Sequence, residues 1–166
     1  ISSRNIFVNP RQLREQDLAH VPEDRQRMGL VTEFNASENL IFGYHHLQPF
    51  SKSSIMMGKT IYNHSKRIMQ EYDVRPQSPF LKTSNFSGGN QQKIILSREL
   101  NRDPKVLLVG QPTRGVDIGA VEFIHQRIID MHDKGVAVLL VSVELDEILS
   151  LADRIVVMFD GELVGE

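Results

Sequence analysis

Short runs of consecutive apolar residues, rich in β-branched side chains, recur in the second half of the chain. They occupy residues 106–109, 136–141 and 155–158. Runs that are apolar at every position are typical of strands buried on both faces of a parallel sheet. Because helix-like stretches separate these runs, the pattern predicts an α/β sheet with right-handed connections.

The longest amphipathic stretch between these runs predicts a helix over residues 118–133. Its apolar residues lie three or four positions apart and therefore share one face, namely Val121, Ile124, Ile128 and Met131. Asp117 precedes this helix and suits its N-cap. A shorter helix is predicted over 145–151, and the turn pair Asp160-Gly161 predicts a final strand over 162–164.

The first half of the chain has a different pattern and predicts a helical lobe beside the sheet. A short strand ends near Val21, and helices are predicted over 36–46 and 60–72. The Ser-rich residues 48–54 and the proline-bearing residues 73–86 are interpreted as loops. The sequence contains no internal repeat and no low-complexity tract.

The composition narrows the classes of function. The 166 residues carry a net charge of −2, whereas a general nucleic-acid binder usually has a basic excess, so no nucleic-acid partner is expected. The absence of cysteine excludes disulfides and thiolate metal sites, and the apolar runs are far shorter than a membrane-spanning helix. The 6 histidines lack the spacing of a metal site, so none is expected, and the pair His45-His46 is interpreted as solvated.

The stretch Ser87-Gly88-Gly89 comes directly before a predicted helix that runs to Leu100. Glycines let the backbone approach a ligand closely, and a helix N-terminus exposes unpaired N–H groups that attract a phosphate. The Ser87 hydroxyl can donate to a phosphate oxygen, but a Ser-capped helix after a glycine turn explains the same residues. The continuation Asn90-Gln91-Gln92-Lys93 favours the phosphate-binding interpretation.

Several motifs in a fixed order resemble those of the ATP-binding cassette (ABC) ATPases. Residues 86–91 resemble the signature motif of this family, residues 107–117 its Walker B strand and D-loop, and residues 153–158 its last strands. Residues 22–40 resemble the Q-loop region of the sugar and nucleoside importers. The resemblance covers essentially the whole chain and matches best the second cassette of a two-cassette importer ATPase for simple sugars or nucleosides.

The resemblance implies the C-terminal part of an α/β, P-loop NTPase-like ABC cassette, with a mostly parallel sheet flanked by helices plus a helical lobe. Residues 1–32 would form the end of the first lobe and the Q-loop, residues 33–86 the helical subdomain, and residues 87–166 the signature helix, Walker B, D-loop and terminal strands. Gly58-Lys59-Thr60 is not a P-loop, because Ser53 stands at the required earlier glycine and no strand precedes it. The P-loop is therefore expected upstream of Ile1, in a longer protein that is cut at both ends.

The positions that serve hydrolysis in the family differ in this sequence. Gly110 and Gln111 replace the Asp of the Mg²⁺ shell and the Glu that polarises the attacking water, and Val143 replaces the switch histidine. Glu23 stands at the usual Gln of the Q-loop. A glycine ligates nothing, and a side-chain amide accepts no proton near pH 7. The combination predicts a half-site that does not hydrolyse ATP, unless Glu144 or an upstream residue substitutes.

The signature loop is intact by comparison, and in the family it closes in trans over ATP held by the opposite cassette. The resemblance therefore assigns ATP binding to Ser87, Gly88, Gly89, Asn90 and Gln91, and the D-loop to Gly115 and Asp117. The full-length protein would use ATP and Mg²⁺ as a transport-coupled ATPase. The fragment alone is expected to be inactive, with no cofactor bound to it.

The resemblance also implies partners, at the cytoplasmic face of the cell membrane. They are the other cassette, in the same chain or in a dimer partner, transmembrane permease subunits and, indirectly, an extracellular substrate-binding protein. The alternative is a non-catalytic regulatory cassette that acts through protein interactions alone. Phe34, Phe42 and Tyr44 either dock a permease segment or pack the helical lobe, and Arg25 and Arg27 are interpreted as a solvated loop rather than as contacts to phosphate or a membrane partner.

Overall fold

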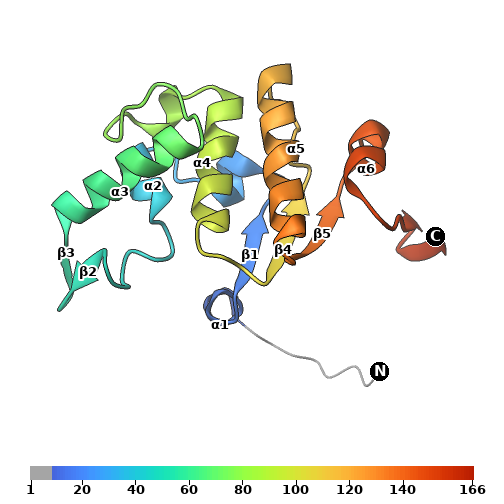
Figure 1. Ribbon diagram of the computed structural model, residues 1–166, viewed down its shortest axis with the longest axis horizontal. Coiled ribbons are helices and arrows are strands. Elements are labelled where there is room, and N and C mark those ends of the chain that lie inside the picture. Colours follow the sequence, from blue (N-terminus) through green and yellow to red (C-terminus); the bar gives the residue numbers. More distant parts are fainter. Residues whose placement is uncertain (1–8) are drawn as a thin grey trace.

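The computed structural model describes residues 9–166. A parallel sheet forms its centre, with β1 (Leu18–Val21), β4 (Val106–Gly110) and β5 (Ala137–Val141) in the order β1-β4-β5 (Figure 1). Leu18 pairs with Val106, and Val106 pairs with Ala137, so the carboxyl ends of these strands meet at one edge. The prediction of a parallel sheet in an α/β fold is confirmed.

Helices α4 (Gly88–Leu100) and α5 (Ile118–Asp133) cover one face of this sheet (Figure 1). Alternate residues of β1 and β4 are buried beneath them, namely Ala19, Val21, Leu107 and Val109. These side chains share one core cluster with Ile94 and Ile95 of α4 and with Ile124 and Ile128 of α5. The core therefore lies between the sheet and the two helices that begin at the predicted glycine loop and at Asp117.

The opposite face of the sheet is largely uncovered within residues 9–166. On β5, Leu139 is 58% exposed and Val141 is 60% exposed. The short helix α6 (Leu145–Leu151) follows β5 as predicted and packs beside α5. The run at 136–141 was predicted to be buried on both faces. This prediction is wrong, because no described residue packs over Leu139 and Val141.

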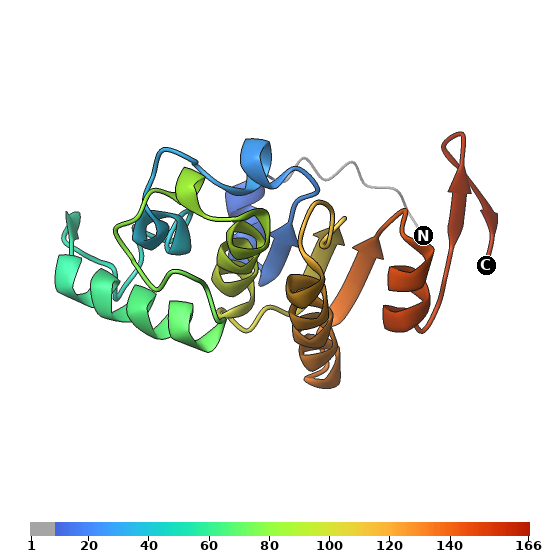
Figure 2. The same ribbon diagram turned by 90° about the horizontal axis from the view of Figure 1, so that it is seen from above.

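The third apolar run does not join the parallel sheet. Strand β6 (Val157–Phe159) pairs antiparallel with β7 (Glu162–Gly165), and this hairpin lies at the far end of the molecule from the helical lobe (Figure 2). Asp160 and Gly161 both have positive φ, of 47° and 80°, which suits a tight hairpin turn. The turn and the final strand are thus confirmed. The prediction that residues 155–158 form a buried parallel strand is wrong, because β6 forms its backbone hydrogen bonds with β7 across the turn.

The helical lobe is built from short elements around one longer helix. It contains α2 (Ala36–Leu40), the two-stranded pair β2 (Ser51–Lys52) and β3 (Ile55–Met56), and α3 (Gly58–Glu71). A 3-10 turn (Thr83–Asn85) leads into α4, and a π-helical turn (Arg25–Gly29) follows β1. Helix α1 (Pro10–Glu15), which the sequence pattern did not predict, precedes β1.

Two predictions in this lobe need correction. The predicted helix over 36–46 ends at Leu40, and Gly43 adopts a positive φ of 86°, which a right-handed helix cannot contain. The predicted loop over 48–54 contains β2 and part of the turn to β3. Gly58 opens α3 after this small antiparallel pair, so Gly58-Lys59-Thr60 lies outside the strand-to-helix setting of a P-loop.

None of the helices that residues 9–166 form is both long enough and apolar enough to span a membrane.

Candidate functional site

The predicted glycine loop opens α4, with Ser87 as its N-cap. The Ser87 Oγ accepts hydrogen bonds from the Asn90 backbone N–H, at 3.4 Å, and from Asn90 Nδ2, at 2.9 Å. Asn90 Oδ1 in turn accepts a hydrogen bond from the Arg75 backbone N–H at 2.6 Å. These hydrogen bonds support the capping interpretation, and Ser87 remains exposed at the helix start.

Gln91 occupies a different position from the other residues of the loop. Its side chain is only 3% exposed, and its Nε2 donates to the Thr83 carbonyl at 3.1 Å. Its Oε1 accepts from Gln26 Nε2 at 3.4 Å. Gln91 therefore links α4 to the 3-10 turn and to the segment after β1, and its assignment to ATP binding stays a prediction.

The two glycines of the loop lie against the start of α5 and the turn before it. A Cβ on Gly88 would lie 2.7 Å from the Gly115 carbonyl oxygen, and a Cβ on Gly89 would lie 2.8 Å from the Ala120 Cβ. Real Cβ atoms do not approach other atoms this closely, so any larger residue would separate the helices. The close packing of α4 on the D-loop region requires these glycines, independently of any ligand.

Asp117 fulfils the structural role predicted for it. Its Oδ1 accepts a hydrogen bond from the Ala120 backbone N–H at 3.0 Å, so it caps α5. Gly115, two residues earlier, has a positive φ of 63°, which favours glycine. The structure thus brings the predicted signature and D-loop residues together at the starts of α4 and α5.

The positions predicted to be degenerate gather at the carboxyl edge of the sheet. Glu23 lies two residues after β1, Gly110 ends β4 with Gln111 next, and Val143 lies two residues after β5. The Gln111 N–H donates to the Val141 carbonyl at 2.8 Å, and Val143 is 80% exposed. Ligands of open α/β sheets bind outside this edge, so its side chains decide what chemistry it supports.

At this edge the space beside Gly110 is small, and one carboxylate already has a partner. A Cβ on Gly110 would lie 3.2 Å from the Glu23 backbone nitrogen, so an Asp there would crowd the segment after β1. The Glu23 carboxylate is already paired with Arg114, whose Nη1 lies 2.6 Å from Oε1. Glu144 is exposed at the start of α6. No group of three or more potential metal ligands occurs among residues 9–166.

The sequence interpretation missed two groups beside this site. Arg25, interpreted as part of a solvated loop, donates hydrogen bonds to the backbone carbonyls of Arg114 and Gly115. The buried Glu147 of α6 accepts from Thr113 Oγ1 at 2.8 Å and lies 3.1 Å from His125 Nε2. Both join residues that are far apart along the chain, so no local pattern could have revealed them.

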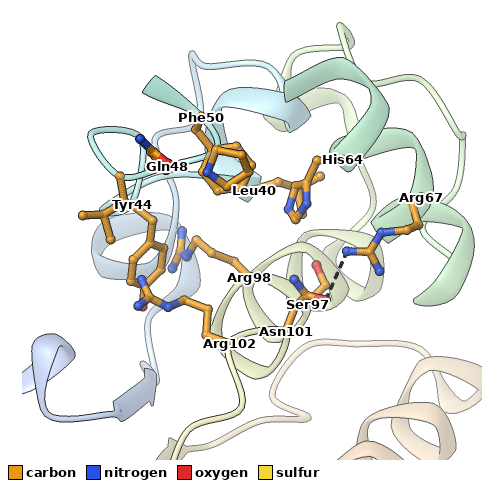
Figure 3. A pocket seen from close by; sticks show the side chains of 12 residues that line it. Leu40, Tyr44, Gln48, Phe50, His64, Arg67, Ser97, Arg98, Asn101 and Arg102 are labelled. Carbon is orange, nitrogen blue, oxygen red and sulfur yellow. Dashed lines mark hydrogen bonds between the residues drawn. The ribbon is translucent and has the colours of Figure 1, made fainter. Parts of the chain in front are cut away.

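Away from this edge, a concave surface lies between the helical lobe and the carboxyl end of α4 (Figure 3). This cavity of about 350 Å³ is lined by Tyr44, Phe50, His64, Arg67 and Arg102, among others. The Arg102 guanidinium lies 3.6 Å from the centre of the Tyr44 ring. Burial, together with the nearby Arg67 charge, lowers the pKa of His64 to about 4, so this imidazole is neutral at physiological pH.

The aromatic residues of the lobe divide between its core and its surface. Tyr44 is buried, and its hydroxyl is 3.2 Å from Glu99 Oε2, which decides for the packing interpretation of this residue. Phe34 and Phe42 are 41% and 40% exposed, and their rings meet edge to face at 6.4 Å. This pair remains available for a partner.

Comparison with known proteins identifies relatives along nearly the whole chain, although no protein-family model matches it. The chain is 47% identical over 156 residues to the nucleoside import ATP-binding protein NupA of Lactococcus lactis, a match that covers 94% of the chain. It is 41% identical over 158 residues to the guanosine import ATP-binding protein NupO of Bacillus subtilis, covering 95% of the chain. In each case the chain spans about a third of the relative's length (31%).

Solved structures give the fold independently of these sequences. The structure of a nucleotide-free ATP-binding cassette from an ABC transporter superposes with a TM-score of 0.73 at 22% identity, covering 96% of this chain and 65% of that one. A dimeric ATP-binding cassette bound to ADP and Pi gives a TM-score of 0.64 at 21% identity, covering 85% of this chain and 60% of that one. At these identities the similarity shows the fold alone.

Proposed function

Because the chain is a member of the ABC ATPases, homologous to the ATP-binding proteins of nucleoside and sugar importers, we propose that it serves in such an importer. The longer protein would couple ATP binding and hydrolysis to the transport of a simple sugar or nucleoside. Since the chain spans only 31% of NupA, this role concerns the longer protein that contains it. ATP and Mg²⁺ are its expected cofactors.

We assign the start of α4 to the binding of ATP held by another cassette. The observation that supports this is the exposed Ser87 at the N-terminus of a 13-residue helix. Helix N-termini attract phosphate through unpaired N–H groups and the helix dipole. Gly115 and Asp117 lie directly behind this loop and would accompany it across the interface.

We propose further that the hydrolytic site at the carboxyl edge of this chain's own sheet is degenerate. Gly110 and Gln111 supply neither a Mg²⁺ ligand nor a general base, and the Glu23 carboxylate is paired with Arg114. Loss of a general base costs about 10² to 10⁴ in rate. Productive hydrolysis would then occur at the site completed by Ser87, not at this edge.

The permease contact is assigned to the helical lobe. The exposed pair Phe34–Phe42 offers apolar surface for a permease segment, and the cavity lined by Tyr44 lies in the same lobe. We propose that the protein acts at the cytoplasmic face of the membrane. The extracellular substrate-binding protein would be reached only through the permease.

The alternative, a non-catalytic cassette that acts through interactions alone, predicts that Ser87 is dispensable. Ser87→Asp in the full-length protein separates the two, because Asp is as good an N-cap as Ser but repels a phosphate. We expect unchanged stability. ATPase and transport activity should fall by at least about tenfold, which corresponds to a rise of about 1.4 kcal/mol in the activation free energy. Asn35→Asp, at the N-cap of α2, is the matched control and should leave both activities unchanged. Full activity in the Ser87→Asp variant would favour the interaction-only role.

A further inference from the structure

The guanidinium group of Arg25 binds two consecutive backbone carbonyls from a distant part of the chain. Its Nη1 donates to the Arg114 carbonyl at 2.6 Å, and its Nη2 donates to the Gly115 carbonyl at 3.0 Å. The residue is half-buried, and its Nε is fully buried. Hydrogen bonds from a charged donor are shorter and stronger than those between neutral groups. The contact therefore fixes the turn before α5 to the segment after β1.

The same guanidinium lies against the first residue of α4. A Cβ on Gly88 would be 2.6 Å from Arg25 Nη2, so the missing side chain of Gly88 provides the space that the guanidinium fills. Gly115 also faces it, since a Cβ there would lie 3.4 Å from the same nitrogen. Arg25 thus touches the starts of the signature-like loop and of the D-loop-like turn with one planar group.

A second link runs in parallel with the first. The Glu23 carboxylate pairs with the Arg114 side chain at 2.6 Å, whereas Arg25 binds the Arg114 backbone. The absent side chain of Gly110 lets the Glu23 backbone approach the end of β4, within 3.2 Å of where a Cβ would lie. Asp24, between the two linking residues, accepts from the backbone N–H groups of Gln26 and Arg27 and so rigidifies this segment.

We propose that Arg25 is a positioning residue for the ATP site that this chain completes in trans, an inference that rests on the proposed function. By holding residues 114–115 against the start of α4, it fixes the orientation of the Ser87 loop and of Asp117 relative to each other. Its planar fork spans two carbonyl oxygens, which the single ammonium group of a lysine cannot do in the same way. The segment after β1, at the edge proposed not to hydrolyse ATP, would thus support the ATP site that the Ser87 loop completes.

The test compares Arg25→Met and Arg25→Lys with Arg27→Met in the full-length protein. Arg27 lies on the same π-helical turn, and its exposed side chain makes no hydrogen bond or ion pair within the described residues. We expect Arg25→Met to lower kcat by about 10 to 10² fold with little change in the KM for MgATP, because small misplacements of positioning groups have effects of this size. Arg25→Lys should recover kcat only in part, and Arg27→Met should match the wild type. Unchanged kcat in Arg25→Met, or full recovery by lysine, would overturn the proposal.

Amide hydrogen exchange provides a readout that does not depend on turnover. The Val116 N–H donates to the Thr113 carbonyl at 3.2 Å, in the turn that Arg25 holds. In the nucleotide-free protein, exchange at Val116 and Ala120 should be faster in Arg25→Met than in Arg27→Met. Equal exchange rates in the two variants would overturn the proposed link. A wild type without ATPase activity would instead refute the proposed function, and the exchange measurement would still be informative. Faster exchange with unchanged kcat would reduce Arg25 to a structural contact and overturn its positioning role.

Discussion

Gly89 gives the most direct test of the packing at the candidate site. It is the second residue of α4, and a Cβ at this position would lie 2.8 Å from the Ala120 Cβ and 2.8 Å from Asp117 Oδ2. Carbon atoms attract optimally at about 3.5 to 4.0 Å, so Gly89→Ala requires the starts of α4 and α5 to separate by about 1 Å. The substitution therefore disturbs both the interhelical contact and the carboxylate that caps α5.

The expected cost follows from these contacts. Overpacking of a close-packed core typically costs about 1 to 3 kcal/mol. Disturbing the Asp117 cap adds about 1 kcal/mol, and the better helix propensity of alanine returns about the same amount. Gly89→Ala should therefore lower the free energy of unfolding by about 1 to 3 kcal/mol.

Gly119→Ala is the matched control, because Gly119 is likewise the second residue of a helix that begins with a side-chain cap. A Cβ at Gly119 would meet Asp117 Oδ1 at 3.6 Å, an ordinary contact, so this variant should be more stable by about 0.4 to 1 kcal/mol. The midpoints and slopes of urea unfolding give both values. Equal stability of the Gly89→Ala and Gly119→Ala variants would refute the packing argument for the loop glycines.

Two further predictions concern the stability contributions of His64 and Glu147. The pKa of His64 is about 4, below its ordinary value of about 6.5, so the unfolded chain binds the proton first and stability is lost as the pH falls from about 6.5 to 4. The loss is about 1 to 2 kcal/mol after solvent screening of this partly exposed ring, and urea unfolding at several pH values should show it in the wild type but not in His64→Gln. Glu147→Ala leaves Thr113 and His125 without their partner and should lower the free energy of unfolding by about 2 to 3 kcal/mol in the same assay. A loss no larger than that of a substitution at an exposed position would show that this cluster contributes little to stability.

The sequence pattern predicted well those elements whose signals are local. The α5 helix was predicted with its correct bounds because Asp117 caps it and its apolar residues recur at helical spacing. The turn at Asp160-Gly161 was predicted because these residues accept positive φ. At the candidate site, Ser87 as a cap could be predicted for the same reason, since the capping hydrogen bond spans only three residues.

Features that depend on neighbours distant along the chain were not accessible in this way. The run at 155–158 has the composition of a buried strand, yet nothing in it specifies whether a parallel partner or β7 supplies its hydrogen bonds. Helix α2 stops at Leu40 although apolar residues continue beyond it, and Gly43 takes a left-handed conformation beside Arg14. Arg25 was interpreted as solvated because its acceptors lie 89 and 90 residues away.

The glycines of this chain illustrate how one sequence feature supports two explanations that must be separated by experiment. Gly88 is needed both by a phosphate-approaching backbone and by the space that Arg25 occupies, since its Cβ would lie 2.6 Å from Nη2. Gly110 stands where a Mg²⁺ ligand is predicted to be missing, and it also gives the Glu23 backbone room, since a Cβ there would lie 3.2 Å from the Glu23 nitrogen. In each case the packing role can be tested by stability and the ligand role by kcat, and these quantities respond to different substitutions. Arg25 and Glu23 bind the same residue, Arg114, the first through its backbone carbonyl and the second through its side chain. These paired contacts support our proposal that this edge holds the loop that would bind ATP in trans, and the kcat of Arg25→Met tests it.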